Sequence, residues 1–120
     1  MKKRFKQCDL DLDRAQNLTP EMVRDALVTC FLEAQGDVLR QTMQRLGIPP
    51  TPDRLREKAL SIVRTAFRQT GGDFEHPTAS SIRKVMEYMA AKAASWGTPA
   101  EVIEYHLGQF RRALDRLDAE

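Results

Sequence analysis

The sequence has few of the features that mark a metal, redox or membrane protein. Its only cysteines, Cys8 and Cys30, are 22 residues apart and form no Cys-x-x-Cys or Cys/His cluster, which excludes the usual zinc and redox motifs. No apolar run reaches the about 18 residues of a membrane span, and none follows the basic start as in a secretory signal. We therefore expect a cytoplasmic protein without a bound cofactor, with Cys30 reduced and buried.

Local motifs for catalysis are also missing. The sequence has no Gly-x-Ser-x-Gly nucleophile motif, no Gly-x-x-x-x-Gly-Lys phosphate loop and no Glu-x-x-His of di-iron helical bundles. Glu104 and His106 would point about 200° apart on a helix, and the acids and histidine of 73–76 fall in a predicted loop. These absences favour a protein without catalytic activity. An enzyme with a non-local active site stays an alternative, because distant residues can form a site without a local pattern.

The charge is nearly balanced over the 120 residues, at +2 overall. Residues 1–18 hold five basic and three acidic side chains and so carry the whole excess, which leaves 14 of the 19 basic and 14 of the 17 acidic side chains in the rest. We predict a flexible N-terminal tail over 1–18 and a single helical-bundle domain over 19–120. The neutral body argues against nucleic acid, because phosphate binding needs a basic surplus.

Threonine and proline mark four helix starts. Thr-Pro pairs begin at Thr19, Thr51 and Thr98, and Pro77-Thr78 has the reverse order. A threonine hydroxyl can accept the unpaired N–H groups at a helix start, and proline fits the first helical position. Glu101 follows three residues after Thr98, and this spacing predicts a capping box there.

The apolar residues between these starts repeat with a helical period. The pattern predicts helices over 20–46, 52–69 and 79–96 and a last helix after Thr98, with no strand-like alternation in the body. The connections are short, which favours antiparallel neighbours. We therefore predict an all-α fold, an up-and-down four-helix bundle.

The first predicted helix differs from the others in two respects. It contains Gly36, which costs about 1 kcal/mol relative to alanine, and its apolar stripe changes direction there, so we predict a kink or split near Gly36. It also has apolar residues on more than one side, as expected of a central helix or of an interface. Val28, Leu32 and Met43 are therefore candidate interface residues.

The preferred functional prediction is a small helical interaction or regulatory module. We expect it to self-associate as a homodimer, and another protein is a further candidate partner. The alternative is a DNA-binding regulator with a helix-turn-helix over 89–106. Glu101 and Glu104 weaken this alternative, because acids in the first turn of a recognition helix repel phosphate.

A possible basic contact face lies on the second predicted helix. It comprises four side chains that project away from the apolar stripe: Arg54, Lys58, Arg64 and Arg68. Such a face can contact RNA, an acidic partner or a phosphate, or it can simply be solvated. No aromatic residue is interleaved with it as a stacking platform, which argues against single-stranded nucleic acid.

Overall fold

The computed structural model describes residue 12 and residues 14–119, and all regular secondary structure in these ranges is helical. The helices are α1 (Pro20–Arg45), α2 (Pro52–Gln69), α3 (Ala79–Ser95) and α4 (Ala100–Ala119), and no strand occurs in this part of the chain. The all-α prediction is confirmed for these residues. The first three helices start where the sequence predicts and end within one residue of it.

Threonine hydroxyls cap the first three helices. The side chains of Thr19, Thr51 and Thr78 each accept a hydrogen bond, at 3.0 to 3.3 Å, from the backbone N–H three residues later. At α3 the cap is reciprocal, because the Thr78 N–H also donates to the Ser81 hydroxyl at 2.8 Å. These caps satisfy amide groups that have no partner within the helix, which explains why the helix starts could be predicted.

The capping box predicted at Thr98 is wrong. The first hydrogen bonds of α4 run to the carbonyl of Pro99, from the N–H of Ile103 at 3.2 Å among others, so Pro99 occupies the N-cap position. Thr98 is 7% exposed, and its hydroxyl accepts a hydrogen bond from Nε2 of Gln35 at 3.1 Å. A buried amide from α1 therefore takes the hydroxyl that the local sequence offers to α4.

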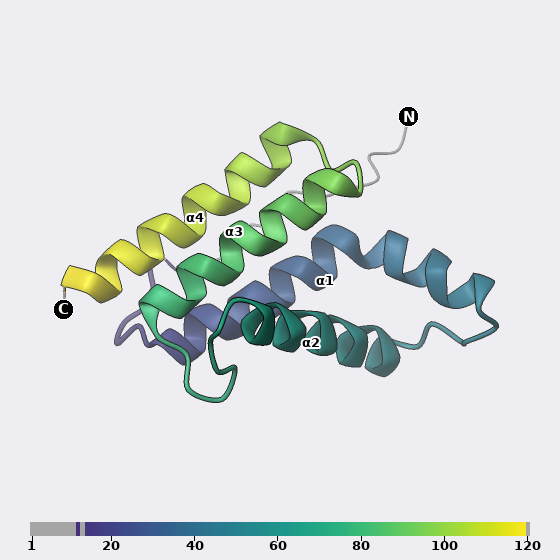
Figure 1. Cartoon of the computed structure of the whole chain (residues 1–120), viewed down its shortest axis with the longest axis horizontal. Helices are drawn as coiled ribbons and strands as arrows, with labels where there is room; N and C mark the ends of the chain where they lie inside the picture. The colour runs from purple at the N-terminus through teal and green to yellow at the C-terminus, as the bar shows by residue number, and fades with distance from the viewer. Residues whose placement is uncertain (1–11, 13, 120) are drawn as a thin grey trace.

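Successive helices run in opposite directions, as expected for an up-and-down path (Figure 1). α1 and α3 each contact all three other helices, whereas the backbones of α2 and α4 do not approach each other closely. α1 thus has helical neighbours on several sides. This position explains, within a single chain, why α1 is apolar on more than one side.

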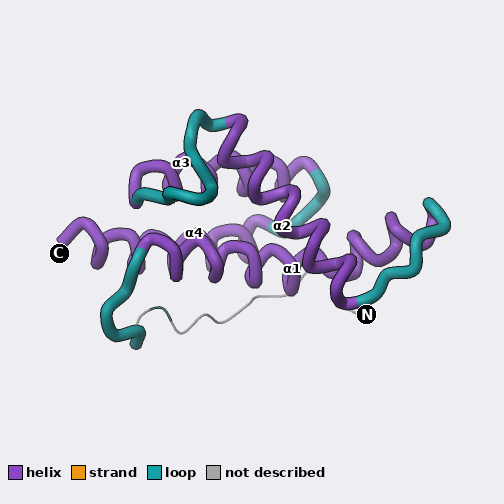
Figure 2. The backbone as a smooth tube through the Cα atoms, turned by 90° about the horizontal axis from the view of Figure 1, so that it is seen from below, coloured by secondary structure: helices purple, strands orange, loops and turns teal. Residues whose placement is uncertain are grey.

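α1 is 26 residues long and continues through Gly36 without interruption. A split of the helix at Gly36 is therefore not present, and a kink stays a prediction. The last turns of α1 and the loop over 46–51 extend beyond the other helices (Figures 1 and 2). In the second half of α1 Leu39 and Met43 are buried, whereas Leu46, which follows the helix, is 69% exposed.

The core takes side chains from all four helices and from the segment before α1. Its largest fully buried side chains include Phe67 and Phe110. Leu12 and Leu18 are also buried in it, and the Arg116 guanidinium donates to the carbonyls of Leu12 and Ala15. The described part of the predicted tail thus packs on the body, while residues 1–11 and 13 lie outside the described residues.

Candidate functional site

A groove between α2 and α3 combines aromatic, cationic and hydroxyl groups on one surface. We call it the α2/α3 groove. It holds about 280 Å³ of space. Its walls come from three helices and the residue after α3: Phe31, Lys58, Ser61, Ile62, Thr65, Tyr88, Met89, Lys92, Ser95 and Trp96.

Aromatic rings from α1 and α3 line the groove. Trp96, directly after α3, is 43% exposed, and its ring meets the buried ring of Phe31 edge-on, with 6.0 Å between the centroids. Tyr88 lies two turns earlier on α3, and the Lys92 ammonium sits 5.5 Å from the centre of its ring. The groove therefore offers an exposed aromatic surface on a buried support.

Two exposed lysines face this surface from different helices. Lys58 comes from α2 and Lys92 from α3, and neither forms an ion pair within the described part of the chain. The hydroxyls of Ser61, Thr65 and Ser95 add groups that can donate or accept hydrogen bonds. The groove thus has the chemistry to receive a negatively charged group next to an apolar one.

The predicted basic face is exposed along α2 but does not form one site. Lys58 belongs to the groove. Arg64 turns toward the α2–α3 connection and pairs with Glu75 at 3.8 Å. The other two donate within their own neighbourhood: Arg68 to the Thr65 hydroxyl, and Arg54 to the carbonyl of Pro49. Tyr88 and Trp96 could not be assigned to this site from the sequence, because they belong to α3 and to the residue after it, far from Lys58 along the chain.

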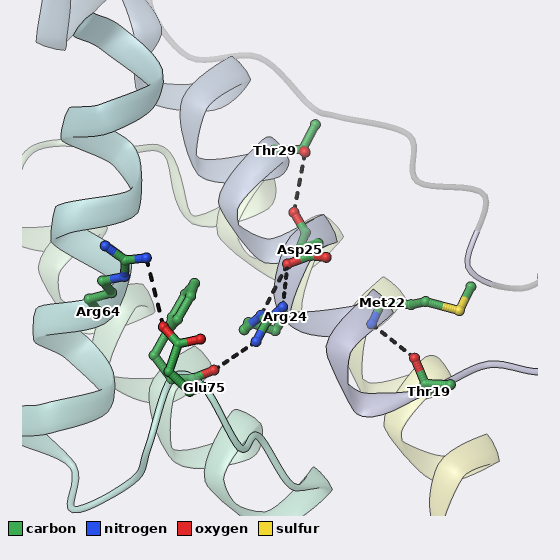
Figure 3. A network of polar contacts seen from close by, with 8 residues as sticks. Thr19, Met22, Arg24, Asp25, Thr29, Arg64 and Glu75 are labelled. Carbon is green, nitrogen blue, oxygen red and sulfur yellow. Dashed lines mark hydrogen bonds and ion pairs between the residues drawn. The ribbon is translucent and has the colours of Figure 1, made fainter. Parts of the chain in front are cut away.

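The connection over 70–78 is fixed by its aromatic residue, Phe74. The guanidinium of Arg24 lies 4.6 Å from the centre of the Phe74 ring and that of Arg64 lies 4.9 Å from it. Arg24 also donates to the Phe74 carbonyl at 2.8 Å, and the ring packs edge-on against Phe67. Figure 3 shows Arg24 and Arg64 reaching this connection from two helices. We call this arrangement the Phe74 clamp.

The three candidate interface residues lie mainly inside the single chain. Val28 is 1% exposed and Met43 is 8% exposed, and both belong to the core. Leu32 is half-buried and packs against the core. Their role in contacts between copies stays a prediction.

The acid–base groups singled out from the sequence lie in separate places. Asp73 and His76 are exposed and 2.9 Å apart, and this contact lowers the pKa of Asp73 and raises the pKa of His76. Glu104 is exposed and pairs with Arg111 at 3.7 Å. His106 instead lines an apolar cavity between α1, α3 and α4, where burial lowers its pKa. No group of three potential metal ligands gathers among the described residues.

The stretch over 89–106 contains the end of α3, a short turn and the first part of α4. Gly97 has a φ of 90° in this turn, a conformation that favours glycine. Glu101 and Glu104 are exposed on the first turns of α4. The geometry is that of a hairpin of long helices, and DNA binding through it stays a prediction.

No family model, curated protein or solved structure matches this chain. None of the helices in the described ranges has the length and apolar character needed to cross a membrane.

Proposed function

We propose that the protein is a non-catalytic interaction module that binds an acidic segment of another protein in the α2/α3 groove. The observation that carries this proposal is the exposed Trp96 ring beside Lys58 and Lys92, neither of which has a carboxylate partner among the described residues. Tryptophan is enriched among the residues that dominate binding energy at interfaces. Lysines that face such a ring select a partner of opposite charge.

An acidic peptide fits this groove better than a nucleic acid does. Beyond residue 18 the numbers of basic and acidic side chains are equal, whereas nucleic acids need many phosphate contacts for affinity. The groove offers two ammonium groups, which suits one or two carboxylates. The hydroxyls of Ser61, Thr65 and Ser95 can hydrogen-bond to a peptide backbone, and Trp96 can pack on an apolar side chain of the same peptide.

Trp96 makes the proposal directly testable, because it is the only tryptophan in the sequence. We expect a blocked peptide of sequence Glu-Glu-Leu-Phe-Glu-Glu to shift the fluorescence of Trp96 in a saturable manner. Replacing both Lys58 and Lys92 with Gln should weaken binding at least about fivefold. Lys84→Gln is the matched control, since Lys84 is exposed at the start of α3 and lies outside the groove.

Three results would contradict the proposal. One is no saturable change up to about 1 mM peptide, the weak end of specific affinity. Another is equal binding of a peptide with lysine in place of each glutamate. The third is a Lys58→Gln, Lys92→Gln variant that binds as tightly as the Lys84→Gln control.

Self-association is a second candidate function, favoured by the apolar residues at the end of α1. Leu46 is 69% exposed and Ile48 is 41% exposed, on the part of the chain that extends beyond the other helices. Two copies can cover these residues across a twofold axis. We expect light scattering to show a dimer that Leu46→Glu with Ile48→Glu dissociates. A strict monomer at about 50 µM would remove this proposal.

A further inference from the structure

A second concave site lies between α1, α3 and α4. We call it the Gln35 cavity. It has a volume of about 70 Å³ and is lined mostly by apolar side chains, among them Leu27, Ala34, Met86 and Leu107. Phe31 and Met89 line both this cavity and the α2/α3 groove. No charged carboxylate, lysine or arginine is among its lining residues.

Gln35 is the unusual member of this cavity. Its side chain is 3% exposed, and Nε2 donates to the Thr98 hydroxyl at 3.1 Å. Its Oε1 is fully buried and has no hydrogen-bond partner among the described residues. Buried side-chain oxygens of folded proteins nearly always have a partner, because leaving one without a donor is costly. A buried acceptor without a donor, in a cavity, points to a donor that comes from outside the chain.

The hydrogen bond to Thr98 also fixes the orientation of the Gln35 amide. The sequence offers its hydroxyl as the N-cap of α4, but in the structure it holds Nε2 of Gln35 and Pro99 takes the N-cap position. A helix without a side-chain cap is less stable. The fold thus gives up a local stabilising contact and fixes the Gln35 amide, with the other end of the amide left unpaired.

The rest of the cavity defines the charge and size of the missing group. His106 is half-buried and burial lowers its pKa from 6.5, so that it is neutral at pH 7. A charged ligand would find no counter-ion in such a lining. A cavity of about 150 Å³ can hold the six non-hydrogen atoms of benzene, so 70 Å³ holds a molecule of about three non-hydrogen atoms.

We propose that the Gln35 cavity binds a small neutral molecule with an apolar body and one hydroxyl or N–H group that donates to Oε1 of Gln35. Access to Oε1 requires a side chain to move, because the atom is enclosed. Met86 and Met89 line the cavity, and their unbranched thioether chains can change rotamer to admit the ligand.

The proposal is tested with three probes of matched size, ethanol, propane and dimethyl ether, the last two supplied as gases. Ethanol has a donor, propane has no polar group and dimethyl ether has only an acceptor. Dissociation constants come from proton–nitrogen correlation spectra of the whole chain, in which the signals of Gln35 and Thr98 identify the site. We expect ethanol to bind about fivefold to tenfold more tightly than propane, the effect of one satisfied hydrogen bond.

Gln35→Leu separates the role of the amide from that of the apolar lining. In this variant we expect ethanol and propane to bind within about twofold of each other, with the affinity for propane kept or raised. Gln44→Leu is the control, because Gln44 is exposed on the same helix, and it should keep the preference for ethanol. If Gln35→Leu does not fold, the ratio of the probes' dissociation constants for the wild-type chain still tests the proposal.

Equal binding of ethanol and propane to the wild-type chain would overturn the proposal. So would tighter binding of dimethyl ether than of ethanol, since the amide would then present its N–H group to the ligand. Absence of ethanol binding up to about 100 mM would also overturn it. None of these outcomes depends on the peptide at the α2/α3 groove, which is followed through Trp96.

Discussion

Cations lie over aromatic rings in two regions of this molecule, and the two regions differ in what surrounds the cations. In the Phe74 clamp, the arginines come from α1 and α2 and each also has an acidic partner, Asp25 for Arg24 and Glu75 for Arg64. In the α2/α3 groove, Lys92 lies over the Tyr88 ring and has no ion pair within the described residues. The arginines of the Phe74 clamp thus have both an aromatic ring and a carboxylate as neighbours, whereas Lys92 in the groove has a ring but no carboxylate partner among the described residues.

We interpret the difference as a structural role for the Phe74 clamp, and it supports the binding role proposed for the α2/α3 groove. The Phe74 ring is half-buried and packs on the core, and the Phe74 carbonyl accepts a hydrogen bond from Arg24, so the clamp fixes the connection between α2 and α3. In the groove, the Tyr88 ring beneath Lys92 is half-buried, and Trp96 is 43% exposed. Ring and cation surface is therefore available to a partner there, as the proposal requires.

The largest expected effect is that of Phe74→Ala. Removing the ring deletes the contacts with Phe67 and with both arginines. We expect the free energy of unfolding to fall by about 2 to 3 kcal/mol, somewhat less than for a fully buried phenylalanine. Urea unfolding followed by circular dichroism measures it. A loss below about 0.5 kcal/mol would mean that the clamp does not fix the connection.

Trp96→Ala should have the opposite profile. We expect a loss of only about 1 kcal/mol in the free energy of unfolding, because Trp96 is partly exposed and its one aromatic ring contact among the described residues is with Phe31. Affinity for the acidic peptide should fall at least about tenfold, as measured by calorimetry, since this variant has no tryptophan signal. Unchanged affinity would show that the groove does not bind through this ring.

The contributions of the two histidines to stability should depend on pH in opposite directions. Burial lowers the pKa of His106, so the contribution of the neutral ring to the free energy of unfolding is complete above pH 6.5 and is lost as the pH falls below it. Asp73 raises the pKa of His76, so the contribution of the charged ring to the free energy of unfolding is present below pH 6.5 and is lost as the pH rises through the raised pKa. His76 is exposed and its contact is screened by solvent.

We therefore expect wild-type stability to decrease between about pH 7 and pH 5.5. His106→Leu should flatten this part of the profile, and His76→Gln should leave it unchanged. Urea unfolding at several pH values is the measurement. A profile that flattens with His76→Gln instead would assign the dependence to the exposed pair.

The smallest effects on stability are expected from single charges. Arg64→Gln should lower the free energy of unfolding by less than about 1 kcal/mol, because its ion pair with Glu75 is exposed. Lys58→Gln should change it by less than about 0.5 kcal/mol while it weakens peptide binding. If Lys58→Gln destabilised the chain more than Arg64→Gln, the distinction between a structural Phe74 clamp and an α2/α3 groove that is not needed for stability would be wrong.

The helices could be predicted from the sequence because the signals that start them are local. Thr19, Thr51 and Thr78 each bond to an amide three residues away, so a short window contains the whole interaction. Thr98 fails the same rule because Gln35 competes for its hydroxyl from 63 positions away. The turn between α3 and α4 was correctly placed, but the residue that caps α4 was not.

The candidate sites could not be predicted, because their residues are far apart in the sequence. The α2/α3 groove joins Phe31, Lys58 and Trp96, and these residues meet only after three helices have packed. The buried position of Gln35 could not be predicted either, because a single polar residue within an apolar helical pattern is normally assigned to the surface of the helix. Helical periodicity reports which face of a helix is buried, but it does not report which polar atom on that face lacks a partner.

Phe31 has a consequence for both sites at once. Its ring supports Trp96 in the α2/α3 groove and is also a wall of the Gln35 cavity. A ligand that shifts this ring from one side changes the shape of the site on the other side. Any such effect must be reciprocal, since a small molecule that alters peptide affinity by some factor has its own affinity altered by the same factor. One phenylalanine of α1 thus links the two proposed sites thermodynamically.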